Sequence, residues 1–200
     1  MHAAQAFDVI VDSAKLWWKD WANQVLVSLA MILASLTIVL LPPALFGVYQ
    51  ETLDLVHNTR TGIGGWWKGF KQYFLKSLLW GLVNLIVALV LLTNLWFYYN
   101  SEGPVPPILV IVTIIMLIFW MVWQFYSLAC FFLQEQASLK LAWKNGFIVI
   151  LKNPLYTLVI SLTMLAISIL SFYIYIPLIL GSIPLLTILS LQAVKATIGD

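Results

Sequence analysis

The charged residues of this chain are gathered into clusters, and the stretches between the clusters are long. The chain has 200 residues, of which ten are basic and eight are acidic. Four stretches without any charged side chain cover residues 21–50, 77–101, 103–134 and 153–194. A helix needs about 20 apolar residues to cross the hydrocarbon core of a bilayer. The spacing of the charges therefore predicts a membrane protein with several transmembrane helices.

The composition indicates the same class of protein. Hydrophobic residues make up 62% of the chain, charged residues make up 9%, and the mean hydropathy is +0.98. In water, a chain of this length would expose more apolar surface than its own core could bury. We expect an all-α, polytopic transmembrane helical bundle that forms a single membrane domain over residues 1–200, with no separate soluble catalytic domain.

The first uncharged stretch decides whether there are five or six membrane segments. Residues 22–41 can span, but Pro42 and Pro43 then stop or kink the helix. A further helix over 44–59 either returns through the membrane or lies on its surface. The later segments are expected near 77–99, 107–132, 154–175 and 178–196, with a break at Ile176-Pro177 between the last two.

The distribution of lysine and arginine favours six segments. With five spans, eight basic residues face one side of the membrane and two, Lys15 and Lys19, face the other. With a hairpin at Pro42-Pro43, all ten basic residues share one side. Because basic residues concentrate in cytoplasmic loops, the second topology is preferred, with both termini cytoplasmic. It predicts a tight non-cytoplasmic turn at Gly103–Pro107 and a helix start at Asn153-Pro154.

Three short amphipathic stretches combine tryptophan with lysine, and each lies shortly before a predicted span. Such pairs are typical of the membrane interface, where the indole ring has one apolar and one hydrated edge. We expect interfacial elbow helices here, the first over residues 1–20, and a threefold repeat of an elbow and a helical hairpin. The alternative is that any helix near an interface collects these residues. The predicted anchors are Trp17, Trp18, Lys19, Trp66, Trp67, Lys68, Trp143 and Lys144.

Few residues are available for catalysis or metal binding. The chain has one cysteine, Cys130, and two histidines, His2 and His57, so an internal disulfide and a three-histidine metal site are excluded. No glycine-rich phosphate loop or catalytic triad stands out. Nucleic-acid binding is not expected, because membrane topology already explains the basic residues. We expect no enzymatic activity, no catalytic residues, no cofactor and no metal.

One polar group of side chains is a candidate site. Gln50, Glu51, Asp54 and His57 recur at helical spacing within the 44–59 segment. The favoured interpretation is a solvated face at the cytoplasmic end of a helix. The alternative hypothesis is a polar cavity in which the two carboxylates and the imidazole bind a cation or move a proton.

Several blocks of the sequence resemble the YesL-like family of small bacterial membrane proteins. They are Leu41–Tyr49, in which Pro42-Pro43-Ala44 replaces the Gly-Pro-Ala usual in the family, Trp67–Gly81, and the stretch from Ala142 through Leu158. The resemblance implies an all-helical protein of the bacterial plasma membrane. Members are often associated with carbohydrate uptake systems, and the family has no catalytic residues to transfer.

Two functions follow as expectations. The first is an accessory protein that packs against another membrane complex, such as a carbohydrate ABC importer, or forms a homo-oligomer. The absence of charged residues within the later spans and the abundance of tryptophan and phenylalanine support it. The second is a small permease or lipid-handling protein with a polar pathway near Glu51, Asp54 and His57.

Overall fold

The computed structural model describes residues 3–175 and 181–199, and within these residues the chain is helical and contains no strand. The prediction of an all-α fold is therefore confirmed. The break predicted at Ile176-Pro177 lies outside the described residues. In chain order, the elements are α1 (Ala3–Lys19), α2 (Trp21–Ser35), the 3₁₀ turn η1 (Ile38–Leu40), α3 (Leu41–Val56), α4 (Ile63–Gln72), α5 (Phe74–Tyr99), α6 (Pro106–Leu133), α7 (Leu139–Lys152), α8 (Pro154–Ile174) and α10 (Ser182–Gly199).

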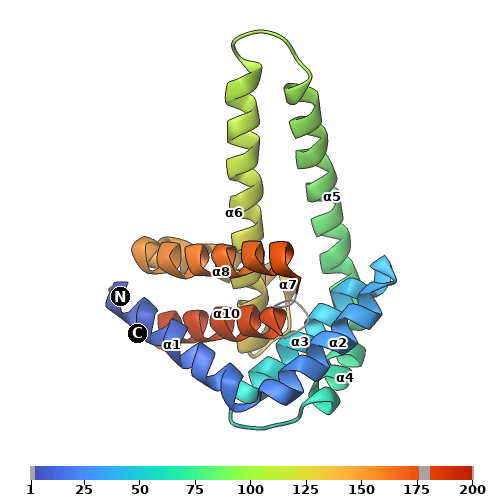
Figure 1. Ribbon diagram of the computed structural model, residues 1–200, viewed down its shortest axis with the longest axis vertical. Helices are drawn as coiled ribbons and strands as arrows, with labels where there is room; N and C mark the ends of the chain where they lie inside the picture. The colour runs from blue at the N-terminus through green and yellow to red at the C-terminus, as the bar shows by residue number, and fades with distance from the viewer. Residues whose placement is uncertain (1–2, 176–180, 200) are drawn as a thin grey trace.

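Helices α5 and α6 form a hairpin that extends away from the other helices along the long axis of the molecule (Figure 1). The chain reverses between them at residues 100–105, where Gly103 has a φ of +117°, a conformation that glycine adopts readily. Pro106 then begins α6, as proline can in the first turn of a helix. The turn lies where the paired prolines predict it, and the side of the membrane that it faces stays a prediction.

The remaining helices and the last turns of α6 form a body at the foot of the hairpin, with α3 at its centre. Helix α3 contacts α2, α4, α5, α6 and α10. Its Phe46 lies edge-on to Phe131 of α6, with 5.3 Å between ring centroids, and its Tyr49 stacks on Phe132 at 5.4 Å. These aromatic contacts join α3 to the foot of the hairpin.

Helix α4 approaches the backbone of α3 very closely. A Cβ atom on Gly47 would lie 2.7 Å from the carbonyl oxygen of Trp66, and a Cβ on Gly69 would overlap the side chain of Gln50. The Trp66 indole Nε1 donates a hydrogen bond of 3.0 Å to the carbonyl oxygen of Ala44. The two glycines therefore allow α4 to lie directly against α3.

The continuous segment predicted over 22–41 is wrong, because α2 ends at Ser35 and a separate 3₁₀ turn precedes α3. Pro42 and Pro43 have no amide hydrogen to donate back to the preceding turn, which prevents a helix from continuing through them into α3, but the break itself lies before the prolines, at residues 36–40. The backbone at Thr37 is extended, with φ −100° and ψ 110°. The prolines instead occupy the first turn of α3, where that hydrogen is not needed.

A short helix is present at each of the three tryptophan–lysine stretches, as α1, α4 and α7. A single residue separates each of them from the helix that follows, namely Asp20, Tyr73 and Asn153 respectively. Helix α8 begins at Pro154, as the sequence predicts. The elements of the described residues thus follow the order elbow, helix, helix three times along the chain.

Three helices among the described residues are long and apolar enough to cross a membrane, namely α5, α6 and α8. This number is smaller than the five to six segments predicted. Helices α2 and α3 have 15 and 16 residues, so they are about 23–24 Å long and shorter than the hydrocarbon core of about 30 Å. In Figure 1, α8 and α10 run across the direction of α5 and α6, so a flat bilayer crossed upright by the hairpin is not crossed upright by α8.

Candidate functional site

The polar side chains predicted to share one face of α3 are separated in the structure. Glu51 is completely buried against α2, and Gln50 is buried toward α4. Asp54 is half-buried, and His57 is exposed at the end of the helix. The predicted solvated helix face therefore includes His57 but not Glu51. The four side chains do not come together in one site.

Glu51 is bonded to Gln24 of α2, a residue that the sequence analysis did not single out. Gln24 Nε2 donates a hydrogen bond of 2.9 Å to Glu51 Oε1 and a longer one of 3.4 Å to Asp20 Oδ2. Asn23 Nδ2 also donates to Asp20, at 2.9 Å. A glutamine within the mostly apolar 22–35 stretch is a signal, but nothing in the sequence pairs it with an acid 27 residues away.

The environment of Glu51 favours its neutral form. Burial removes water from the carboxyl group and raises its pKa from an ordinary value of 4.5 to about 7. The hydrogen bond from Gln24 lowers the pKa, and the negative charges of Asp20 and Asp54 raise it. Glu51 Oε2 and Gln24 Oε1 are buried without a hydrogen-bond partner. The group can therefore hold or release a proton near neutral pH.

The carboxylate of Asp54, unlike that of Glu51, has a hydrogen-bond donor for each of its two oxygens. Its carboxylate accepts hydrogen bonds of 2.8 Å from Gln50 Nε2 and 2.8 Å from Thr61 Oγ1. Its backbone carbonyl accepts one of 2.7 Å from Thr59 Oγ1. Asp54 thus fixes the connection between α3 and α4, and both of its carboxylate oxygens have donors.

The predicted interfacial anchors divide into inward and outward side chains. Trp17 donates to the carbonyl oxygen of Gly181 at 3.0 Å, and Trp66 is buried against α3. Their neighbours Trp18 and Trp67 are exposed, at 70% and 48%. Lys19, Lys68 and Lys144 are also exposed. The inward tryptophans join elements of the body, and the outward ones stay available to a membrane interface together with the lysines.

A second polar cluster lies at the foot of the hairpin. Gln124 Oε1 of α6 accepts hydrogen bonds from Trp80 Nε1 at 2.8 Å, Trp143 Nε1 at 3.3 Å and Asn84 Nδ2 at 3.4 Å. Trp120 Nε1 donates to Asn84 Oδ1 at 3.0 Å. These bonds connect α5, α6 and α7, which is the helix-bridging role that hydrogen-bonding amides perform in membrane proteins.

The described residues contain no group of three or more histidine, cysteine, aspartate or glutamate side chains placed to hold a metal ion. No family model matches the chain, and comparisons with curated proteins and with solved structures likewise find no match. The two features that bear on function are the buried Glu51–Gln24 contact and the apolar hairpin. Their geometry is the basis for inferring what the protein does.

Proposed function

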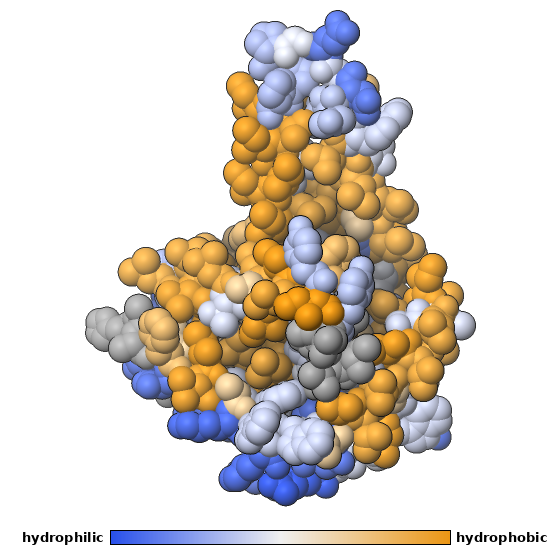
Figure 2. Space-filling model, in the orientation of Figure 1, coloured by the Kyte–Doolittle hydropathy of each residue, from blue (hydrophilic) through white to orange (hydrophobic). Residues whose placement is uncertain are grey.

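We propose that the protein is a non-enzymatic membrane accessory protein whose α5–α6 hairpin packs against the helices of another membrane complex. The observation that supports this proposal most is the exposure of the hairpin. In the most apolar window of each of its helices, only 11% of the residues are buried within the chain. Hydrophobic residues cover the hairpin, while hydrophilic ones lie at its tip and at the opposite end of the molecule (Figure 2).

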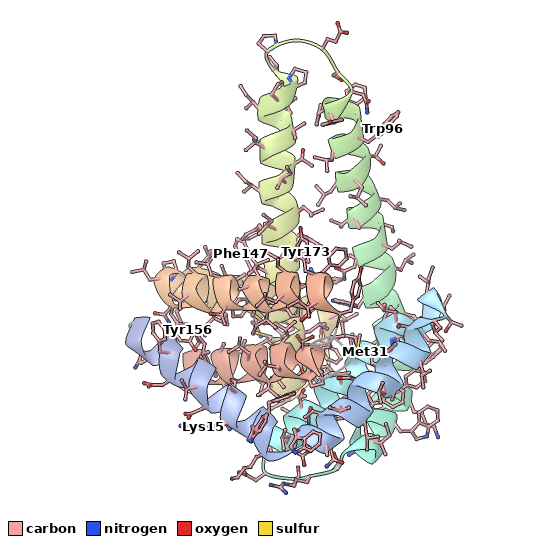
Figure 3. All side chains as sticks on the ribbon, in the orientation of Figure 1. Lys15, Met31, Trp96, Phe147, Tyr156 and Tyr173 are labelled. Atoms are coloured by element: carbon pink, nitrogen blue, oxygen red, sulfur yellow. The ribbon has the colours of Figure 1, made fainter. Side chains whose placement is uncertain are left out.

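The dimensions of the hairpin suit a bilayer. The apolar part of α5, from Leu82 to Tyr99, is about 27 Å long at 1.5 Å per residue, close to the hydrocarbon thickness of about 30 Å. It ends in four aromatic residues, Trp96 to Tyr99, directly before the polar tip. Figure 3 places Trp96 near the tip and Lys15 at the other end of the long axis. Tryptophan and tyrosine are enriched at this depth of a membrane.

Two features of the hairpin favour a protein neighbour in addition to lipid. A groove of about 430 Å³ runs between its helices, lined by Val87, Met116 and Trp120 among others. The side-chain amide of Asn94 has no hydrogen-bond partner among the described residues. Amide side chains within a bilayer associate helices by hydrogen bonding across them. A helix of another protein seated in the groove supplies both apolar side chains and such a bond.

The resemblance to the YesL-like family supports a carbohydrate ABC importer of the bacterial plasma membrane as the neighbouring complex. The permease alternative has less support from the geometry. It needs Glu51, Asp54 and His57 to line one pathway, whereas Glu51 and Gln24 are 0% exposed and His57 lies on the surface.

Gentle purification from the native host, combined with site-specific photo-crosslinking, tests this proposal. A photoreactive residue at Met116, in the hairpin groove, should crosslink to a protein that also co-purifies in a fixed ratio. The same residue at Leu155, an exposed apolar position on α8, is the matched control and should not crosslink to that protein. A partner-free particle in which Met116 labels lipid alone would contradict the accessory role.

A further inference from the structure

The buried contact between α2 and α3 leaves two oxygen atoms without a hydrogen-bond donor. Gln24 Nε2 donates to Glu51 Oε1 at 2.9 Å, while Glu51 Oε2 and Gln24 Oε1 have no partner. Both side chains are 0% exposed, so bulk water does not reach these two oxygens. Buried polar atoms in folded proteins are nearly always hydrogen-bonded, so two unpartnered acceptors on side chains already bonded to each other indicate a missing proton.

We propose that Glu51 binds a proton on Oε2 and donates it to Gln24 Oε1, which closes a cyclic pair of hydrogen bonds between α3 and α2. A neutral carboxylic acid presents one donor and one acceptor, and so complements a carboxamide. An ionised carboxylate has only acceptors and leaves Gln24 Oε1 unpaired. A single proton therefore satisfies both oxygens, and Glu51 is a specific proton-binding site rather than a cation site.

The charged groups around Glu51 reinforce proton binding. Asp20, at the start of α2, and Asp54, one turn along α3, both place negative charge near it. Helix α2 itself has no charged residue, and α6 has none either. Other neighbouring elements direct their charges elsewhere: Lys68 and Lys71 of α4 and Lys195 of α10 are exposed, and Lys76 of α5 donates to the carbonyl oxygen of Ala137. No cation in the described part of the chain is bonded to the Glu51 carboxyl group.

Release of the proton to water changes the contact between α2 and α3. The new carboxylate faces the unpaired Gln24 Oε1 and the nearby Asp20, and both disfavour a second negative charge. Burial places the pKa of Glu51 at about 7, so the change falls near neutral pH. The proton thus acts as a ligand that holds α2 on α3 and leaves as the pH rises. This inference does not depend on the accessory role.

A titration of the unmodified protein provides the first test. The chain has three glutamates, Glu51, Glu102 and Glu135, and the latter two are exposed. With ¹³C-labelled glutamate in nanodiscs, carboxyl resonances can be followed by NMR against pH. We expect one resonance to titrate near pH 7 and to disappear in Glu51→Gln. Three resonances that all titrate near the ordinary glutamate pKa of 4.5 would overturn the proposal.

Variants provide the second test. Glu51→Gln keeps a donor and an acceptor facing Gln24 but cannot ionise. Glu102→Gln makes the same substitution at an exposed glutamate in the hairpin tip and serves as the matched control. The unfolding equilibrium constant of the native protein should rise by up to about tenfold per pH unit between pH 4.5 and 7. This rise should disappear in Glu51→Gln and persist in Glu102→Gln. An unchanged rise in Glu51→Gln would overturn the proposal, and if that variant does not fold, the titration of the unmodified protein decides.

Discussion

Gln24 of α2 and Glu51 of α3 are joined by a hydrogen bond of 2.9 Å, and both side chains are completely buried. Helix α2 has few other polar residues, and its companion α3 lies at the centre of the body. This contact therefore connects α2 to the central helix α3. Substitutions at Gln24 or Glu51 can test how much the contact contributes to stability.

Gln24→Leu should destabilise the protein by about 1–3 kcal/mol, since it leaves the buried carboxyl group of Glu51 without its donor. Thermal or denaturant unfolding in detergent measures this change. Asn23→Leu is the control, because Asn23 is half-buried and bonds to Asp20 rather than to Glu51. Equal losses in the two variants would contradict a special role for the Gln24–Glu51 contact.

The stability of the folded protein should fall as the pH rises from about 4.5 to about 7. The pKa of Glu51 is raised in the folded state from 4.5 to about 7, so the folded protein binds more protons than the unfolded chain within this window. The contribution is complete below the unfolded value and is lost as the pH passes through the folded one. The shift corresponds to a loss of at most about 3 kcal/mol. Unfolding curves that do not change over this range would contradict the assignment.

Gly69→Ala should weaken the packing of α4 on α3 by about 1–3 kcal/mol, as overpacking does elsewhere. A Cβ atom at position 69 overlaps Gln50 and lies 3.1 Å from the carbonyl oxygen of Phe46. Gly64→Ala is the matched control in the same helix, because nothing lies within 4 Å of a Cβ there. Comparison of the two unfolding midpoints tests the close approach, and a neutral Gly69→Ala would contradict it.

Gln124→Leu should loosen the foot of the hairpin. It removes the acceptor used by Trp80, Trp143 and Asn84, and the buried indole of Trp80 then lacks a partner. We expect a loss of about 1–3 kcal/mol in unfolding measurements. Gln136→Leu, at an exposed loop position, should have little effect, and a similar loss in both variants would indicate that the cluster contributes nothing specific.

The sequence predicts the local features of the fold well, because they depend on neighbouring residues. Prolines and Gly103 place the turn of the hairpin, and Pro154 places the start of α8. The extent of the first segment was wrong because the charge-free stretch 21–50 hides the break at residues 36–40. The orientation of α8 across the hairpin is a tertiary feature on which charge spacing has no bearing.

The candidate site was predicted only in part, for a similar reason. Helical spacing places Gln50, Glu51, Asp54 and His57 on adjoining positions of one helix, but packing decides which of them is buried. Glu51 faces α2, and Gln50 faces α4 and Asp54. The partner of Glu51, Gln24, lies 27 residues earlier, and only the folded chain brings the two together. In the same way, packing alone determines that Trp66 points inward and Trp67 outward.

The central claim is that the α5–α6 hairpin crosses the bilayer and meets its partner there, and cysteine accessibility tests the crossing most directly. The one native cysteine, Cys130, is buried, so single cysteines can be introduced at Ser101 in the hairpin tip and at Lys144 on α7. In sealed vesicles of known orientation, an impermeant thiol reagent should label Ser101→Cys and Lys144→Cys from opposite sides of the membrane. Labelling of both positions from the same side would contradict the account.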